Sequence, residues 1–320
     1  MVFQILSEEY ASIGAFIGIL FAFLATIIAT DKLCIFLPKD AGRDFAHDGK
    51  KSAGKPRGAG IIFVLAFVAA ALLFAPFNAE NVIYLILIVV GMMTGFLDDA
   101  SKTPWGEYKK GFLDLCVAAL VAVTFLRYNS NVVELAMFGI KFTIHPVLFA
   151  LLTVVLVWTS VNVTNCSDGV DGLSGTLTII TIMTIYAVDM IKGTAGEFSF
   201  LILLFAVCIL GYLWYNATPS RLMMGDAGSR AMGLFISIAI LKTGCPFLYI
   251  PVAFVLILDG GLGILKVSLI RFCKIHILSN VRTPLHDHVR KVWNWSNTQT
   301  VFRFAIIQII LAIATIYAIK

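Results

Sequence analysis

The chain has 320 residues, of which 59% are hydrophobic and only 13% are charged, and its formal net charge at pH 7 is +5. A soluble domain carries roughly 45–50% apolar and about 25% charged residues. This composition excludes a soluble enzyme, a disordered chain and a fibrous repeat, and it predicts an all-α integral membrane protein. The six cysteines have no CxxC spacing, so they indicate neither a disulfide framework nor a zinc site.

Ten apolar runs predict about ten transmembrane helices, because about 20 apolar residues cross a bilayer as a helix. The runs lack the period-two alternation of a membrane β-barrel. Between the fourth and fifth runs, residues 132–144 alternate around Gly139 and indicate an external hairpin. The chain 1–320 is expected to form a single polytopic membrane domain. In chain order the runs cover residues 11–31, 58–76, 81–97, 111–127, 145–164, 172–191, 198–215, 227–243, 246–272 and 299–319.

Basic residues give these helices an orientation. The connections after the first, third, fifth, seventh and ninth helices hold 17 Lys and Arg, whereas the opposite side, including both chain ends, holds 5. Cytoplasmic loops of membrane proteins carry the excess of basic residues. The sequence therefore predicts extracytoplasmic termini and cytoplasmic basic loops. Most Asp residues fall in or beside the same loops, which places the predicted active-site loops in the cytoplasm.

Three of the cytoplasmic loops carry carboxylates in motif-like patterns. After the third helix, Asp98 and Asp99 precede Lys102, which shares a helical face with Asp98. After the fifth helix, residues 162–172 hold two Asn, two Asp and two Gly, and free N–H groups at a helix start favour an anionic ligand. Before the eighth helix, Asp226 stands between glycines. Each motif alone also fits a helix cap, a turn or a salt-bridged helix end.

Two further cytoplasmic loops carry imidazoles and cations. His286 and His288 could donate to a phosphate or titrate near neutrality, although a solvated loop can hold incidental histidines. Residues 50–60 hold four cations that could bind a pyrophosphate, but the same charges fit the orientation signal. All five loops lie on one predicted face. Carboxylates for Mg²⁺, cations for phosphates and glycines for close approach are typical of phosphoryl transfer.

The motifs GFLDDASK (95–102), NVTNCSDGVDGLSG (162–175) and MGDAGS (224–229) occur in this order. Together they resemble the polyprenyl-phosphate N-acetylhexosamine-1-phosphate transferases, and the likeness covers the whole chain. The tail TPLHDHVRKVWNWSNTQTVFRF (283–304) is similar to the phospho-MurNAc-pentapeptide transferase branch. This resemblance implies a multi-pass enzyme of the bacterial plasma membrane. It would transfer phospho-MurNAc-pentapeptide from UDP-MurNAc-pentapeptide to undecaprenyl phosphate with Mg²⁺, giving lipid I and UMP for peptidoglycan synthesis.

The resemblance also implies roles for individual residues. It makes Asp226 the Mg²⁺ ligand as well as a catalytic residue. The other catalytic residues that it implies are Asp98, Asp99, Lys102, His286 and His288. The residues that it places against the substrate are Lys51, Lys110, Asn165, Asp168, Gly169, Val170, Asp171, Asn216 and Met223.

Three positions depart from the family pattern. Asp287 replaces the middle one of three successive histidines, which puts a role for a central imidazole in doubt. Met223 stands where an aromatic residue often stacks on uracil, and a thioether packs less specifically. The early loop reads GKPRGAG (54–60), whereas the family pattern is closer to a Thr-Pro-Thr-Met-Gly-Gly run. These departures concern the specificity for the sugar and its peptide rather than the reaction class.

Several alternatives remain open at this stage. Within the family, a UDP-GlcNAc-1-phosphate transferase that uses undecaprenyl phosphate fits the same motifs. Outside it, a cation-coupled transporter is favoured by Asp259, which interrupts the ninth helix beside three glycines. Those glycines fit either a kink that opens a groove for a lipid tail or close helix packing. We expect membrane lipid but no nucleic acid as a partner, and the sequence leaves open whether the protein forms a homodimer. The sequence does not choose between direct transfer and a covalent aspartyl-phosphate.

Overall fold

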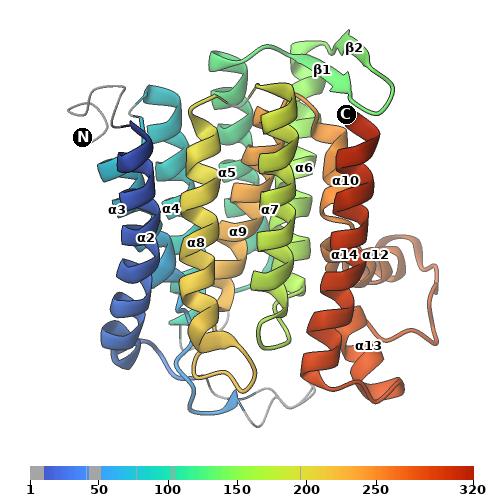
Figure 1. Cartoon of the computed structure of the whole chain (residues 1–320). Helices are drawn as coiled ribbons and strands as arrows, with labels where there is room; N and C mark the ends of the chain where they lie inside the picture. The colour runs from blue at the N-terminus through green and yellow to red at the C-terminus, as the bar shows by residue number, and fades with distance from the viewer. Residues whose placement is uncertain are drawn as a thin grey trace.

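The computed structural model describes residues 11–40, 42, 52–76, 78–101, 103, 105–194 and 196–320. Over these residues the chain forms a bundle of helices that run up and down, with one small hairpin (Figure 1). The elements are α2 (Ala11–Leu33), η2 (Cys34–Phe36), α3 (Gly60–Phe74), α4 (Ala79–Asp99), α5 (Glu107–Tyr128), β1 (Val132–Leu135), β2 (Ile140–Thr143), α6 (Pro146–Cys166), α7 (Leu173–Lys192), α8 (Phe198–Asn216), α9 (Gly225–Lys242), η4 (Pro246–Leu248), α10 (Tyr249–Val252), α11 (Phe254–Leu256), η5 (Ile257–Gly261), α12 (Leu262–Ser268), η6 (Leu269–Cys273), α13 (Leu285–Val292) and α14 (Asn297–Ile319).

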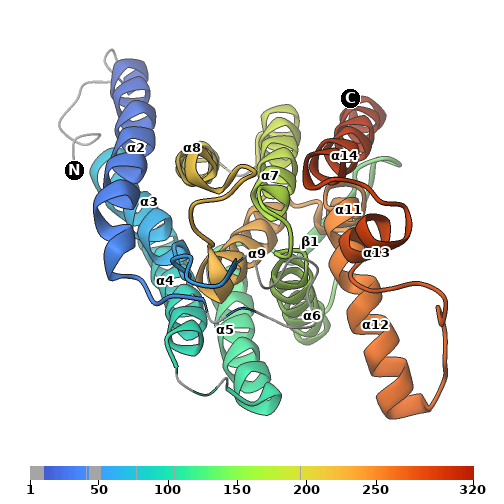
Figure 2. The ribbon, with the colours of Figure 1, turned by 90° about the horizontal axis from the view of Figure 1, so that it is seen from below.

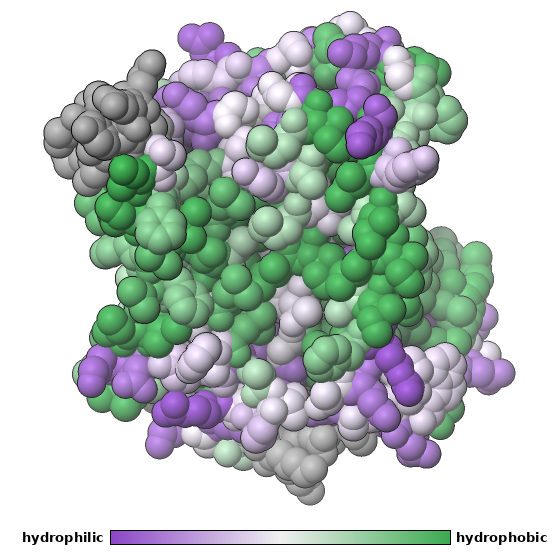
Figure 3. Space-filling view, viewed as in Figure 1, coloured by the Kyte–Doolittle hydropathy of each residue, from purple (hydrophilic) through white to green (hydrophobic). Residues whose placement is uncertain are grey.

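Apolar side chains cover the waist of the bundle, and polar side chains gather toward its two ends (Figure 3). In the part of the chain that the structure describes, seven helices are long and apolar enough to cross a membrane, or eight if one bent pair is a single span. This confirms an all-α integral membrane protein. All ten predicted spans fall on helices, but α3 has only 15 residues and α9 carries three charged residues, so these two are not among the seven.

Helix α9 is the centre of the bundle, and its neighbours enclose it in the end-on view (Figure 2). Every residue from Ala227 to Leu241 is buried. The one charged residue inside that stretch, Arg230, forms a buried ion pair with Asp114 of α5. An unpaired charge in this environment would be strongly destabilising. The pair therefore allows a helix that starts in a polar loop to continue through the apolar core.

Two glycines bring α3 and α4 into backbone contact with the start of α9. A Cβ atom at Gly60 would lie 2.0 Å from the Gly228 nitrogen, and one at Gly95 would lie 2.4 Å from the carbonyl carbon of Asp226. Any larger residue would push the helices apart. The loop before α3 and the end of α4 are thereby held against the first turn of α9.

The hairpin lies at one end of the bundle, where α2 begins and α14 ends (Figure 1). Its strands pair antiparallel, with Val132 opposite Thr143 and Leu135 opposite Ile140. The predicted hairpin over 132–144 is confirmed. The loops after α2, α4, α6 and α8 lie at the other end (Figure 1). Which end faces the cytoplasm stays a prediction from the distribution of Lys and Arg.

The predicted ninth helix is bent by 72° between residues Pro246–Val252 and Phe254–Cys273. The π-helix η5 follows this bend and carries Asp259. A Cβ atom at Gly260 would lie 2.2 Å from the Val163 carbonyl oxygen of α6. The glycines in this region therefore serve close packing against α6 as well as accompanying a bend.

Candidate active site

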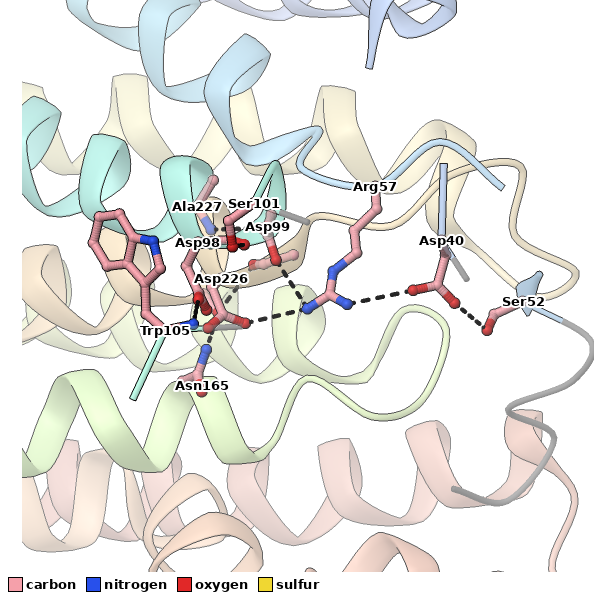
Figure 4. A network of polar contacts seen from close by, with 12 residues as sticks. Asp40, Ser52, Arg57, Asp98, Asp99, Ser101, Trp105, Asn165, Asp226 and Ala227 are labelled. Carbon is pink, nitrogen blue, oxygen red and sulfur yellow. Dashed lines mark hydrogen bonds and ion pairs between the residues drawn. The ribbon is translucent and has the colours of Figure 1, made fainter. Parts of the chain in front are cut away.

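Three carboxylates from two separate motifs, Asp98, Asp99 and Asp226, meet at the end of the bundle that carries the loops after α2, α4, α6 and α8 (Figure 4). We call these three carboxylates the acidic cluster. Asp98 and Asp99 end α4, and Asp226 lies in the first turn of α9. The Ala227 amide donates to Asp99 Oδ2 at 3.3 Å. Gly225 has a φ of 67°, and a Cβ atom there would lie 2.2 Å from Asp99 Oδ2. Only glycine fits this backbone and this close approach.

Two cations lie among these carboxylates. Lys110 of α5 forms an ion pair with Asp98, and its Nζ lies 3.6 Å from Asp226 Oδ2. Arg57 Nη2 lies 2.8 Å from Asp99 Oδ1 and 3.6 Å from Asp226 Oδ1. Lys110, which the sequence analysis placed against the substrate, thus joins the acidic cluster directly.

Arg57 was one of the four cations in residues 50–60 that could bind a pyrophosphate, but it was not among the residues to which the resemblance gave a role. Its other nitrogen, Nη1, donates to Asp40 Oδ1 at 3.3 Å, so the guanidinium bridges Asp40 to the acidic cluster. Burial disfavours the charge of Arg57, but the carboxylates of Asp99, Asp226 and Asp40 raise its pKa above the ordinary value. The signal that could have identified Arg57 was its place in the basic loop 50–60, where its charge was also explained by membrane orientation.

The donor set fits a divalent cation. Four carboxylates (Asp40, Asp98, Asp99, Asp226) and two cations (Arg57, Lys110) leave a formal charge of minus two. Across the described residues, no three His, Cys, Asp or Glu side chains form a metal cage. Mg²⁺ is usually held by one or two carboxylates together with waters and substrate phosphates rather than by such a cage. Asp226, whose side chain is 15% exposed, is accessible enough to hold Mg²⁺ together with water and a substrate phosphate.

The loop after α6 contacts the same region. The Asn165 amide donates to Ser229 Oγ of α9 at 2.9 Å. Asp168 is half-buried and interacts electrostatically with Arg57, whereas Val170 is buried in the core. This loop therefore presents Asn165 and Asp168 toward the acidic cluster.

Asn216 and Asp171 connect two loops. Asn216 is buried, accepts from the Gly172 amide at 2.8 Å and donates to the Leu222 carbonyl at 2.8 Å. Asp171 Oδ2 accepts from the Ser220 amide at 3.1 Å. Because their polar atoms bind backbone groups, both side chains hold the loops after α6 and α8 in register.

Met223 is joined to the early basic loop through its backbone. Its amide donates to the Pro56 carbonyl at 2.8 Å, and its carbonyl accepts from the Ala59 amide at 3.0 Å. These two bonds form a short parallel bridge between Arg57 and Met223. The segment before α9 and the segment before α3 are therefore fixed side by side.

His286 is buried between η5 and the loop after α6. Its Nδ1 lies 2.9 Å from Asp259 Oδ2, and its amide donates to Asp259 Oδ1 at 2.7 Å. A Cβ atom at Gly169 would lie 2.2 Å from His286 Nε2, so only glycine leaves room for the imidazole. The Arg290 guanidinium donates to the Gly169 carbonyl at 3.4 Å. Asp259, which had suggested a transporter, is therefore the partner of His286.

His288 lies in a different environment. Its Nδ1 accepts from the Arg282 amide at 3.2 Å, and its ring contacts that of Trp293 at a centroid distance of 5.7 Å. No hydrogen bond or ion pair links it to Asp98, Asp99 or Asp226 within the described ranges. The predicted residues Lys51 and Lys102 lie outside the residues that the structure describes.

The buried pair of His286 and Asp259 predicts a pH-dependent stability. Burial and the nearby Arg290 lower the pKa of His286, whereas Asp259 and Asp287 raise it. The carboxylates have the larger effect, so the pKa lies above the ordinary 6.5. Stabilisation is therefore complete below pH 6.5 and is lost as the pH rises through the raised pKa. We expect the unfolding temperatures of the wild type and His286→Gln to differ most at acidic pH and to converge on alkalinisation.

Thermal unfolding in detergent between pH 5.5 and 9 measures this difference. His288→Gln is the control, because its ring nitrogen binds a backbone amide rather than a carboxylate. A difference that is constant with pH for His286→Gln would contradict the prediction.

Comparisons with known proteins identify the family to which the chain belongs. Residues 81–244 match the model of the glycosyl transferase family 4. A phospho-N-acetylmuramoyl-pentapeptide-transferase of Treponema pallidum (strain Nichols) is 40% identical over 296 residues, which cover 87% of this chain and 82% of the relative. A protein of the same name from a Nitratiruptor species is 26% identical, over 100% of this chain and 98% of the relative. Another from Bartonella quintana (strain Toulouse) is also 26% identical, over 94% of this chain and 90% of the relative.

The matched family segment contains the two motifs that meet at the site, namely the end of α4 and the start of α9. A transporter does not fit a family of transferases, and the carboxylate that favoured one is paired with His286. The chain belongs to the glycosyl transferase family 4, with phospho-N-acetylmuramoyl-pentapeptide-transferases as its relatives, and is a glycosyl-1-phosphate transferase.

Proposed function

We propose that the protein transfers phospho-MurNAc-pentapeptide from UDP-MurNAc-pentapeptide to undecaprenyl phosphate in the bacterial plasma membrane, with Mg²⁺, giving lipid I and UMP. The observation that carries this proposal is the acidic cluster of Asp98, Asp99 and Asp226 with Arg57 and Lys110, at one end of a membrane bundle. The names of the relatives supply the sugar and its peptide.

Asp226 would hold Mg²⁺ together with water and the phosphates of the substrate. The bound ion would supply positive charge that neutralises the diphosphate. Lys110 holds the Asp98 carboxylate, and Arg57 holds that of Asp99, so the acidic groups are oriented before the substrate arrives. Positioning and electrostatics of this kind account for most of the catalysis in phosphoryl transfer.

The aspartates at the end of α4 are held at both carboxylate oxygens. The Trp105 amide donates to Asp98 Oδ1 at 2.7 Å, and Lys110 pairs with Oδ2. Asp99 contacts Arg57 through Oδ1 and the Ala227 amide through Oδ2. A phosphate monoester is mostly a dianion at pH 7, because its second pKa is about 6. Both facts favour direct attack by the lipid phosphate over an aspartyl-phosphate intermediate.

A UMP-release assay with purified protein in detergent tests the proposal. We expect release only when UDP-MurNAc-pentapeptide, undecaprenyl phosphate and Mg²⁺ are all present, and loss of release with a chelator. Turnover of UDP-GlcNAc that equals or exceeds that of UDP-MurNAc-pentapeptide would favour the other branch of the family. Labelled phosphate retained on the protein without the lipid acceptor would overturn direct transfer.

A further inference from the structure

Arg57 lies at the centre of the acidic cluster, where its guanidinium separates the Asp40 carboxylate from those of Asp99 and Asp226 (Figure 4). Its side chain is 19% exposed, so the charge is partly accessible to a ligand. The Arg57 guanidinium therefore lies between the carboxylates and is partly accessible to solvent.

The backbone around Arg57 is fixed on both sides. Its own amide donates to the Pro38 carbonyl at 2.8 Å, and the Asp40 amide donates to the Lys55 carbonyl at 2.9 Å. The bridge to Met223 fixes the other side. Asp40 is buried, accepts from Ser52 Oγ at 2.6 Å and holds Arg57 Nη1, so it acts as a positioning residue.

One donor of Arg57 is still unused. Its Nε is buried and has no hydrogen-bond partner among the described residues. Leaving a buried donor unpaired is unfavourable, especially on a charged group. A guanidinium presents its donors in a planar fork that matches the oxygens of a phosphate. The guanidinium is partly exposed and the protein does not use all of its donors, so an anionic ligand can bind it from the exposed side.

We propose that Arg57 binds the diphosphate of the sugar nucleotide and, through its contacts with Asp99 and Asp226, opposes metal binding at the same carboxylates. The inference rests on the proposed function, since it assumes a diphosphate substrate. Removing the guanidinium changes the formal charge of the four carboxylates (Asp40, Asp98, Asp99, Asp226) and Lys110 from minus two to minus three, which attracts a divalent cation more strongly. The same change removes a phosphate contact. Nucleotide and metal affinities must therefore move in opposite directions.

The test uses the full chain in detergent and compares Arg57→Gln with the wild type. Mn²⁺ binding is measured by electron paramagnetic resonance without nucleotide, and UDP binding by calorimetry at saturating Mn²⁺. We expect Arg57→Gln to bind Mn²⁺ about tenfold more tightly and UDP about tenfold or more weakly. Arg57→Lys keeps the charge but loses the fork, so Mn²⁺ affinity stays near that of the wild type while UDP affinity falls.

Arg221→Gln is the matched control, because this exposed arginine lies over the Tyr215 ring, 5.2 Å from its centroid, and its loss changes the net charge equally. Both of its affinities are expected to be unchanged. Unchanged UDP affinity in Arg57→Gln and Arg57→Lys, or unchanged or weaker Mn²⁺ binding in Arg57→Gln, would overturn the inference. If Arg57→Gln does not fold, the UDP affinity of Arg57→Lys decides. A wild type that binds neither Mn²⁺ nor UDP would instead refute the proposed function.

Discussion

Replacement of Asp226 by Asn is expected to lower turnover about a thousandfold, because removal of one preorganised charge at a reaction centre has effects of this size. The variant loses the carboxylate that lies 3.6 Å from both Arg57 and Lys110. Half-maximal activity should also require more Mg²⁺. UMP release over a Mg²⁺ titration measures both effects.

Asp31→Asn is the control for this variant, because Asp31 is exposed near the end of α2 and its replacement makes the same change of charge. Its turnover and Mg²⁺ requirement should match those of the wild type. If Asp226→Asn kept its metal requirement and turnover, Asp226 would have to be removed from the metal site.

The second large effect is expected from Gly60→Ala. The added Cβ atom would meet the Gly228 nitrogen at 2.0 Å and its Cα at 2.3 Å, and backbone atoms cannot rotate away as a side chain can. Overpacking of this kind costs about 3 kcal/mol. Because α3 must move off α9, Arg57 and Asp226 would separate and activity would fall as well. Chemical unfolding in detergent and UMP release measure the two consequences.

Gly111→Ala provides the matched comparison. Gly111 lies in the helix α5, and a Cβ atom there would meet nothing within 4 Å. Alanine is favoured over glycine in a helix by up to about 1 kcal/mol, so this variant should be as stable as the wild type or more so. Equal unfolding of the Gly60 and Gly111 variants would show that the contact between α3 and α9 does not limit stability.

The sequence predicts much of this site because membrane topology restricts where polar residues lie. Asp98, Asp99 and Asp226 fall at helix ends on one predicted face, and the structure brings them together. The hairpin is likewise predicted by a local alternation around Gly139. Features of this kind depend on neighbouring residues or on the side of the membrane, and both can be inferred from one sequence.

Contacts between distant segments could not be predicted in this way. Asp259 looks like a kink or an ion site within an apolar run, and its partner His286 is 27 residues further along the chain. Arg57 has the same charge as the other residues of its loop, so only the folded chain distinguishes it. Ten spans were predicted and the described structure has seven or eight, because α3 has only 15 residues and the buried α9 carries three charged residues.

The short bridge between Arg57 and Met223 has a consequence for how the protein responds to ligands. The segments on either side of it are far apart in sequence, yet each supplies backbone donors to the other. Their amide protons at Ala59 and Met223 should therefore exchange with deuterium at similar rates. A nucleotide held by one segment would slow exchange in both, so nucleotide binding could be followed on either peptide by mass spectrometry.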